Sequence, residues 1–126
     1  ELLLSQMEDF QQRVVLAKVS KAEFHLPAQP GDQLRLTARL ASTHSDGAIV
    51  EGTVDIGDVR QADLEMTFAI LDESFGDAPF FVPAELCRIL RAMKLFDVGV
   101  NQDGSPIQIP QHMLDEELEL LTRPRV

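Results

Sequence analysis

The stretch AEFHLPAQPGDQLRL, residues 22–36, decides how the first half of the chain folds. It starts at the end of one strand-like run and finishes at the start of another, with the turn sequence Pro30-Gly31-Asp32 between them. Proline fixes φ at the second position of a tight turn, glycine accepts a positive φ at the third, and aspartate can bond the turn's own backbone. The stretch therefore predicts a corner between two strands.

Strand-like patterns lie on both sides of this corner. Residues 13–26 begin apolar on both faces, which is typical of a central strand that is covered on both sides. Residues 33–41, 48–56 and 61–71 alternate apolar and polar side chains, and each predicts a strand with one buried face. Their apolar members are Leu34, Leu36, Ala38 and Leu40, then Ala48, Val50, Gly52, Val54 and Ile56, then Ala62, Leu64, Met66, Phe68 and Ile70.

Turn sequences connect the last three of these runs. Asp46-Gly47 is a strong signal for a two-residue hairpin turn, and IGDVRQ at 56–61 reverses the chain a second time. Three antiparallel strands in a meander are therefore predicted, and the run at 13–26 adds a fourth strand to the sheet.

Helical patterns occupy the two ends of the chain. Leu3, Met7 and Phe10 recur at helical spacing, and no capping residue precedes them, so residues 2–10 predict the tail of a helix. Behind Pro83, residues 84–96 predict an amphipathic helix. Its apolar stripe is Leu86, Ile89, Leu90 and Met93.

One more short helix is predicted near the C-terminus. It carries Leu114, Leu118 and Leu121 on one side. DEELE at 115–119 is expected to be its solvated face, with an acidic interaction face as the alternative.

The composition restricts the class of protein. A chain of 126 residues with 44% hydrophobic content fits one packed domain, and no apolar run approaches the length of a membrane span. A net charge of −10 without a basic patch argues against nucleic acid and anionic membranes as partners. The single Cys87 cannot form an internal disulfide, which favours a reducing, cytoplasmic location. No Cys/His spacing of zinc type and no cofactor motif occurs, so neither a metal nor a cofactor is expected.

One ordered set of residues carries a family resemblance. The set is Ala22, Phe24, Pro27, Pro30, Gly31, Asp32 and Leu34, followed by VDIGDVRQADLEM at 54–66. It resembles the second half of a hotdog domain, and more specifically the β-hydroxyacyl-(acyl carrier protein) dehydratases of fatty-acid synthesis. The resemblance implies an α+β hotdog fold, with a curved antiparallel sheet wrapped around a central helix. Residues 1–72 would form an N-terminally incomplete core, and residues 73–126 a helical extension packed on the same domain or on a partner.

The resemblance also implies an activity and partners. Such proteins eliminate water from 3-hydroxyacyl thioesters to give trans-2-enoyl thioesters, on acyl carrier protein or coenzyme A and without a cofactor. They assemble as homodimers or higher homo-oligomers such as trimers of dimers. A hotdog acyl-CoA thioesterase and a non-catalytic acyl-binding or structural paralogue share the scaffold and stay open as alternatives.

The family's reactive groups do not map onto this chain. They are a His in an H-F-P-G motif, which these 126 residues lack, and a Glu early in the central helix, whose expected position precedes Glu1. The chain also begins without an initiator Met or a leader, so we expect the gene product to start upstream. No catalytic residue is therefore assigned within the chain, and we expect a hydro-lyase if the upstream part carries the pair.

Five apolar residues are candidates for the lining of an acyl tunnel, since helix and sheet faces must meet there. The alternative for each is an ordinary core position. The five are Leu3, Met7, Phe24, Met66 and Phe68.

His25 is the candidate polar residue of the loop or rim, together with Pro30, Gly31 and Asp32. It can be a general base oriented by Asp32 or Glu23, a rim contact to a phosphopantetheine or carrier protein, or a surface histidine. In an extended strand Phe24 and His25 point to opposite faces, so only one of them can face a tunnel.

The remaining expectations concern the basic residues, the cysteine and two further histidines. Positive charge for an acidic carrier protein is concentrated on Arg13, Lys18, Lys21, Arg35 and Arg39. Cys87 is expected to be an inert thiol, and His44 and His112 surface residues.

Overall fold

The computed structural model describes residues 11–124, so the predicted helix tail at 2–10, with Leu3, Met7 and Phe10, lies outside the described residues. The described part falls into two compact units. One comprises residues 14–75, and the other comprises residues 11–13 with 76–124. The architecture is α+β, with the strands in the first unit and the α-helices in the second.

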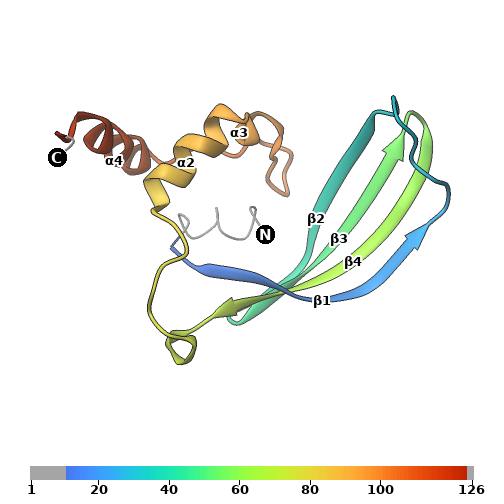
Figure 1. Ribbon diagram of the computed structural model, residues 1–126, viewed down its shortest axis with the longest axis horizontal. Helices are drawn as coiled ribbons and strands as arrows, with labels where there is room; N and C mark the ends of the chain where they lie inside the picture. The colour runs from blue at the N-terminus through green and yellow to red at the C-terminus, as the bar shows by residue number, and fades with distance from the viewer. Residues whose placement is uncertain (1–10, 125–126) are drawn as a thin grey trace. The chain divides into compact units, whose positions relative to one another are not determined.

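The first unit is a four-stranded antiparallel sheet in the order β1-β4-β3-β2. Figure 1 shows its long strands bending along their length. The last three strands form the predicted meander, and β1 lies beside β4 as an outer strand rather than as the predicted central one. The strands are β1 (Arg13–Phe24), β2 (Leu34–His44), β3 (Gly47–Ile56) and β4 (Val59–Leu71).

Strand register places the predicted apolar residues of β3 and β4 on one face. Ala48 pairs with Phe68 and Val54 with Ala62, and all four side chains are buried. Because side chains alternate along a strand, Val50, Gly52, Leu64 and Met66 share that face. The alternation predicted for these two strands is confirmed.

The apolar side chains of β2 alternate in the same way, but Leu34 and Leu36 are not buried. Leu36 pairs with Val54 on the apolar face, yet Leu36 is 75% exposed, and Leu34 is 42% exposed. The inward burial predicted for these leucines is wrong, because β2 is an outer strand with a neighbour on one side alone.

The β2–β3 turn differs from its prediction by one residue. His44 pairs with Gly47, so the turn residues are Ser45 and Asp46, and neither has the positive φ that a type I′ turn requires. Glycine is needed at 47 for a different reason: a Cβ there would lie 2.4 Å from the Phe68 carbonyl oxygen on β4. The second hairpin follows the prediction, with Gly57 at φ 59 between the paired Ile56 and Val59.

The Pro30-Gly31-Asp32 corner is the predicted tight turn. The Asp32 N–H donates to the Gln29 carbonyl at 3.0 Å, and Gly31 occupies the third position with φ 95, as in a type II turn. The Asp32 carboxylate accepts a bond from the Gln29 N–H at 2.8 Å.

The second unit contains three α-helices, α2 (Pro83–Ala92), α3 (Leu95–Val98) and α4 (Gln111–Thr122), while a short 3-10 helix (Glu73–Phe75) closes the first. The single helix predicted for residues 84–96 is wrong at its end. Lys94 adopts a left-handed φ of 62, which breaks the helical path between α2 and α3. None of the helices in residues 11–124 has the length and apolar character to cross a membrane.

The core of this unit differs from the predicted stripes. Cys87, Leu90 and Met113 form the buried cluster, whereas Ile89 and Met93 of the predicted α2 stripe are exposed. In α4 the buried residues are Met113 and Glu117, one helical turn apart, and the predicted Leu118 and Leu121 are each 60% exposed.

Burial of Glu117 also corrects the prediction that DEELE is entirely solvated. Its side chain is 5% exposed and pairs with Arg91 of α2, whose side chain is 47% exposed. The second carboxylate oxygen of Glu117 is buried without a hydrogen-bond partner. The Arg91–Glu117 ion pair therefore joins α4 to α2.

The turn at Gly31 is sensitive to a β-branched residue. Gly31→Val is expected to lower the free energy of unfolding by about 1 to 3 kcal/mol through backbone strain. A Cβ meets no heavy atom within 4 Å there, so steric contact adds nothing. Urea unfolding measures the loss, and Gly31→Asn, which tolerates positive φ better, is the matched control. Equal stability of Gly31→Val and wild type would rule out the type II assignment.

The Arg91–Glu117 pair predicts an asymmetry between its two truncations. Arg91→Ala leaves a buried, unpaired carboxylate and is expected to cost about 3 kcal/mol, whereas Glu117→Ala leaves an arginine that water can reach and costs less. Chemical denaturation followed by helical circular dichroism compares the two variants. A larger loss for Glu117→Ala would contradict this account of the α2–α4 contact.

Candidate functional site

Two of the described tunnel candidates lie on the apolar face of the sheet, and a third lies at the end of β1. Phe68 is buried beside Ala48, and Met66 is half-buried opposite Val50. Phe24 at the end of β1 is 71% exposed. The other two candidates, Leu3 and Met7, lie outside the described residues. The sheet therefore presents a row of apolar side chains along β3 and β4 and an accessible phenylalanine at the end of β1.

His25 lies just after β1 and bonds to a residue that the sequence analysis did not single out. Its Nε2 lies 2.7 Å from Oδ2 of Asp63 on β4. Asp32, which was predicted as an orienting acid, bonds the backbone of its own turn instead. The second predicted acid, Glu23, does lie beside His25 and Asp63, with donor atoms of the three side chains within 4.8 Å of one another.

Asp63 is held from its other side by an arginine. Arg60 Nη1 donates to Asp63 Oδ1 at 2.7 Å, and Arg60 Nε donates to Asp55 Oδ1 at 2.8 Å. The bond to His25, followed by the bond to Arg60, lowers the pKa of Asp63 below its ordinary value of 3.8. The bonds to Asp55 and Asp63 raise the pKa of Arg60. Asp63 is therefore a carboxylate near neutral pH.

A buried glutamine fixes the backbone at this position. Gln61 is 7% exposed, and its Nε2 donates to the Leu26 carbonyl at 3.0 Å. The backbone carbonyl of Gln61 accepts a hydrogen bond from the backbone N–H of His25 at 2.8 Å. Gln61 is also the extra residue of a β-bulge, since Ala62 pairs with Val54 while Arg60 pairs with Asp55. The strand pairing of β1 with β4 thus continues to His25.

The arrangement limits what His25 can do chemically. A histidine bonded to a carboxylate is a general-base geometry. However, alternation along β4 places Asp63 on the face opposite Ala62, and His25 bonds Asp63 there. The pair therefore lies away from the apolar face of the sheet.

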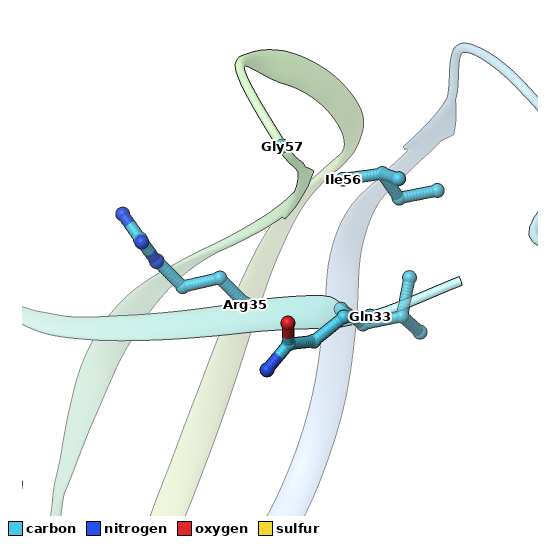
Figure 2. Close-up of a pocket in the computed structure, with 5 residues that line it drawn as sticks. Gln33, Arg35, Ile56 and Gly57 are labelled. Carbon is cyan, nitrogen blue, oxygen red and sulfur yellow. The ribbon is translucent and has the colours of Figure 1, made fainter. Parts of the chain in front are cut away.

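A hollow of about 380 Å³ lies where β2 begins, beside the turn between β3 and β4. Figure 2 shows Gln33 and Arg35 at the start of β2, with Ile56 across from them. Arg35 belongs to the predicted landing surface for an acidic carrier. Within the described residues, Lys21 and Arg39 of that surface pair with Glu23 and Glu51, whereas Arg35 has no ion pair.

Comparison with known proteins finds similarity among solved structures alone. No protein-family model matches the sequence, and no curated protein matches it. Among solved structures, the chain is similar to the BH2602 protein from Bacillus halodurans, whose crystal structure was determined with CoA. Identity is 23% and the TM-score 0.45, and the similarity covers 54% of this chain and 47% of that one. The chain thus spans about half the length of that protein, and a likeness of this size defines neither a family nor a ligand.

The Asp63 interactions predict a pH-dependent loss of stability. A carboxylate whose folded-state pKa is depressed stabilises the fold above its unfolded pKa, and this contribution disappears as the pH falls through the folded-state pKa. Asp63→Asn is therefore expected to be less stable than wild type at neutral pH, and the difference should shrink below about pH 4.

Urea unfolding at a series of pH values measures this difference. Asp58→Asn is the matched control, because Asp58 is exposed in the β3–β4 turn and has no ion pair within residues 11–124. A difference between wild type and Asp63→Asn that does not change with pH would contradict the ionic role of Asp63.

Proposed function

We propose that the chain is the scaffold part of a hotdog-fold protein that binds the acyl chain of a thioester on the apolar face of its sheet. The observation that carries this proposal is the register of β3 and β4, which gathers Val50, Val54, Leu64, Met66 and Phe68 on one face. The corner at Pro30-Gly31-Asp32 and the strand lengths agree with the family resemblance. In a hotdog fold, a central helix covers this face, and the acyl chain lies between helix and sheet.

The reaction that we propose is the dehydration of 3-hydroxyacyl thioesters to trans-2-enoyl thioesters. The chemistry needs a base for the α-proton and an acid for the departing hydroxyl. His25 does not suit the role of base, because it bonds Asp63, which lies on the face opposite the buried Ala62. The described residues therefore supply the binding face, and we expect dehydration if a part of the protein outside residues 11–124 carries the reactive His and Glu.

The carrier of the acyl chain would dock near the start of β2. Arg35 borders the hollow there and has no acidic partner within the described residues. It lies on the face opposite Leu34 and Leu36, so the carrier would reach it around the outer edge of β2. A guanidinium suits the phosphate of a phosphopantetheine, which acyl carrier protein and coenzyme A share. His25 would at most contact the rim.

Assembly as a homodimer or a higher homo-oligomer belongs to the same proposal. β2 is an outer strand that exposes Leu34 and Leu36, and such an edge favours pairing with another chain. The helices of residues 76–124 would form an extension on the same domain or on a partner. We place the protein in the cytoplasm.

Acyl binding is tested with the Phe24→Ala variant. The chain is titrated with 3-hydroxyacyl-CoA thioesters of increasing chain length, and binding is measured calorimetrically. Affinity is expected to rise with chain length and to fall about tenfold in Phe24→Ala, because a large apolar contact is lost. Phe75→Ala is the control, since Phe75 is 68% exposed, close to the 71% of Phe24, and lies outside the strands.

Two outcomes would contradict the proposal. Binding of CoA as tight as that of its acyl thioesters would show that the acyl chain has no site on this face. Formation of the enoyl product by the 126-residue chain itself would support dehydration but contradict the placement of the reactive His and Glu outside this chain.

A further inference from the structure

Three side chains that are chemically suited to a metal ion meet at the end of β1. Glu23 lies in β1 and His25 lies just after this strand, and Asp63 reaches both side chains from β4. One donor atom from each side chain lies within 4.8 Å of the other two. The acyl-binding face proposed above does not include any of the three.

We propose that Glu23, His25 and Asp63 form a binding site for one divalent transition-metal ion of the zinc class. One imidazole nitrogen and two carboxylates form a donor set that Zn²⁺ accepts, with a water molecule to complete a tetrahedron. No local metal-ligand spacing marks this site in the sequence, because Asp63 lies 38 residues from His25 and the pairing of β1 with β4 brings them together.

The donor groups are held in position by their neighbours. Arg60 bonds Asp63 through Oδ1 and leaves Oδ2 directed at His25. Asp55 in turn holds Arg60. Metal ligands in proteins are commonly oriented by such outer hydrogen bonds. Two bonds of Gln61 fix the segment that carries the histidine: its backbone carbonyl accepts the His25 N–H, and its side-chain Nε2 donates to the Leu26 carbonyl.

Only a small movement is needed to admit the ion. Metal–ligand distances of about 2.0 to 2.2 Å in a tetrahedron separate neighbouring donor atoms by about 3.4 Å. The His25–Asp63 separation of 2.7 Å must therefore open slightly. The side chains are 57% exposed for Glu23, 42% for His25 and 29% for Asp63, so rotation is not blocked by packing.

The charges around the site also permit a cation. Three carboxylates, of Glu23, Asp55 and Asp63, stand against the two positive charges of Lys21 and Arg60, which leaves a net negative charge. Lys21 contacts Glu23 at 3.7 Å, which is a long ion pair that a metal ion can displace. Bound metal would crosslink the end of β1 to β4 beside the Pro30 corner.

The experiment is a titration of the chain, without an affinity tag, with ZnCl₂ near neutral pH. Calorimetry is expected to show one ion per chain. His25→Ala and Glu23→Gln should each weaken binding about tenfold or more. His44→Ala is the control, because His44 is an exposed histidine at the end of β2, away from the three ligands. Glu23→Gln removes only an exposed group, so its fold is expected to persist, and circular dichroism without metal checks this.

Nuclear magnetic resonance locates the bound ion, without relying on the binding affinity that calorimetry measures. The chain has three histidines, and Co²⁺ is expected to shift the ring signals of His25 far more than those of His44 and His112. Absence of saturable Zn²⁺ binding, unchanged binding in His25→Ala, or equal effects on all three histidines would overturn the proposal.

Discussion

The pairing of β3 with β4 is the constraint on which the rest of the sheet depends. Because side chains alternate with a period of two, a slip of one residue would turn every apolar side chain of a strand to the opposite face. The close approach of β4 to Gly47 tolerates no side chain there, since a Cβ would lie 2.4 Å from the Phe68 carbonyl oxygen. Gly47 therefore helps to hold the register that brings Ala48 opposite Phe68 and Val54 opposite Ala62.

One interruption of this register lies next to the cluster of Glu23, His25 and Asp63. The bulge at Gln61 inserts one residue into β4, so that the Gln61 side chain and carbonyl both bond to the segment after β1. As a result His25 lies against Asp63, which is on the face opposite Ala62. The apolar face suits an acyl chain and the opposite face suits a cation, so we propose two separate sites on the two sides of one sheet.

Local sequence patterns were sufficient for the strands and the tight corner. The alternation in β3 and β4 and the Pro30-Gly31 turn are local properties, and they could be predicted from neighbouring residues. Asp63 could not be found as the partner of His25, because no local signal gives the register between β1 and β4 or the bulge at Gln61. Similarly, the burial of Glu117 depends on Arg91 of a different helix, so the leucine stripe predicted for α4 was wrong.

The measurement that tests the central claim most directly is methyl nuclear magnetic resonance of the chain during titration with an acyl-pantetheine thioester. If the apolar sheet face binds the acyl chain, the largest shifts will fall on Val50, Val54, Leu64 and Met66, which share that face. Methyl groups of Leu118 and Leu121 on α4, which are exposed but lie outside the sheet, should stay unchanged. Shifts confined to α4, or no acyl-dependent shift on the sheet, would contradict the account.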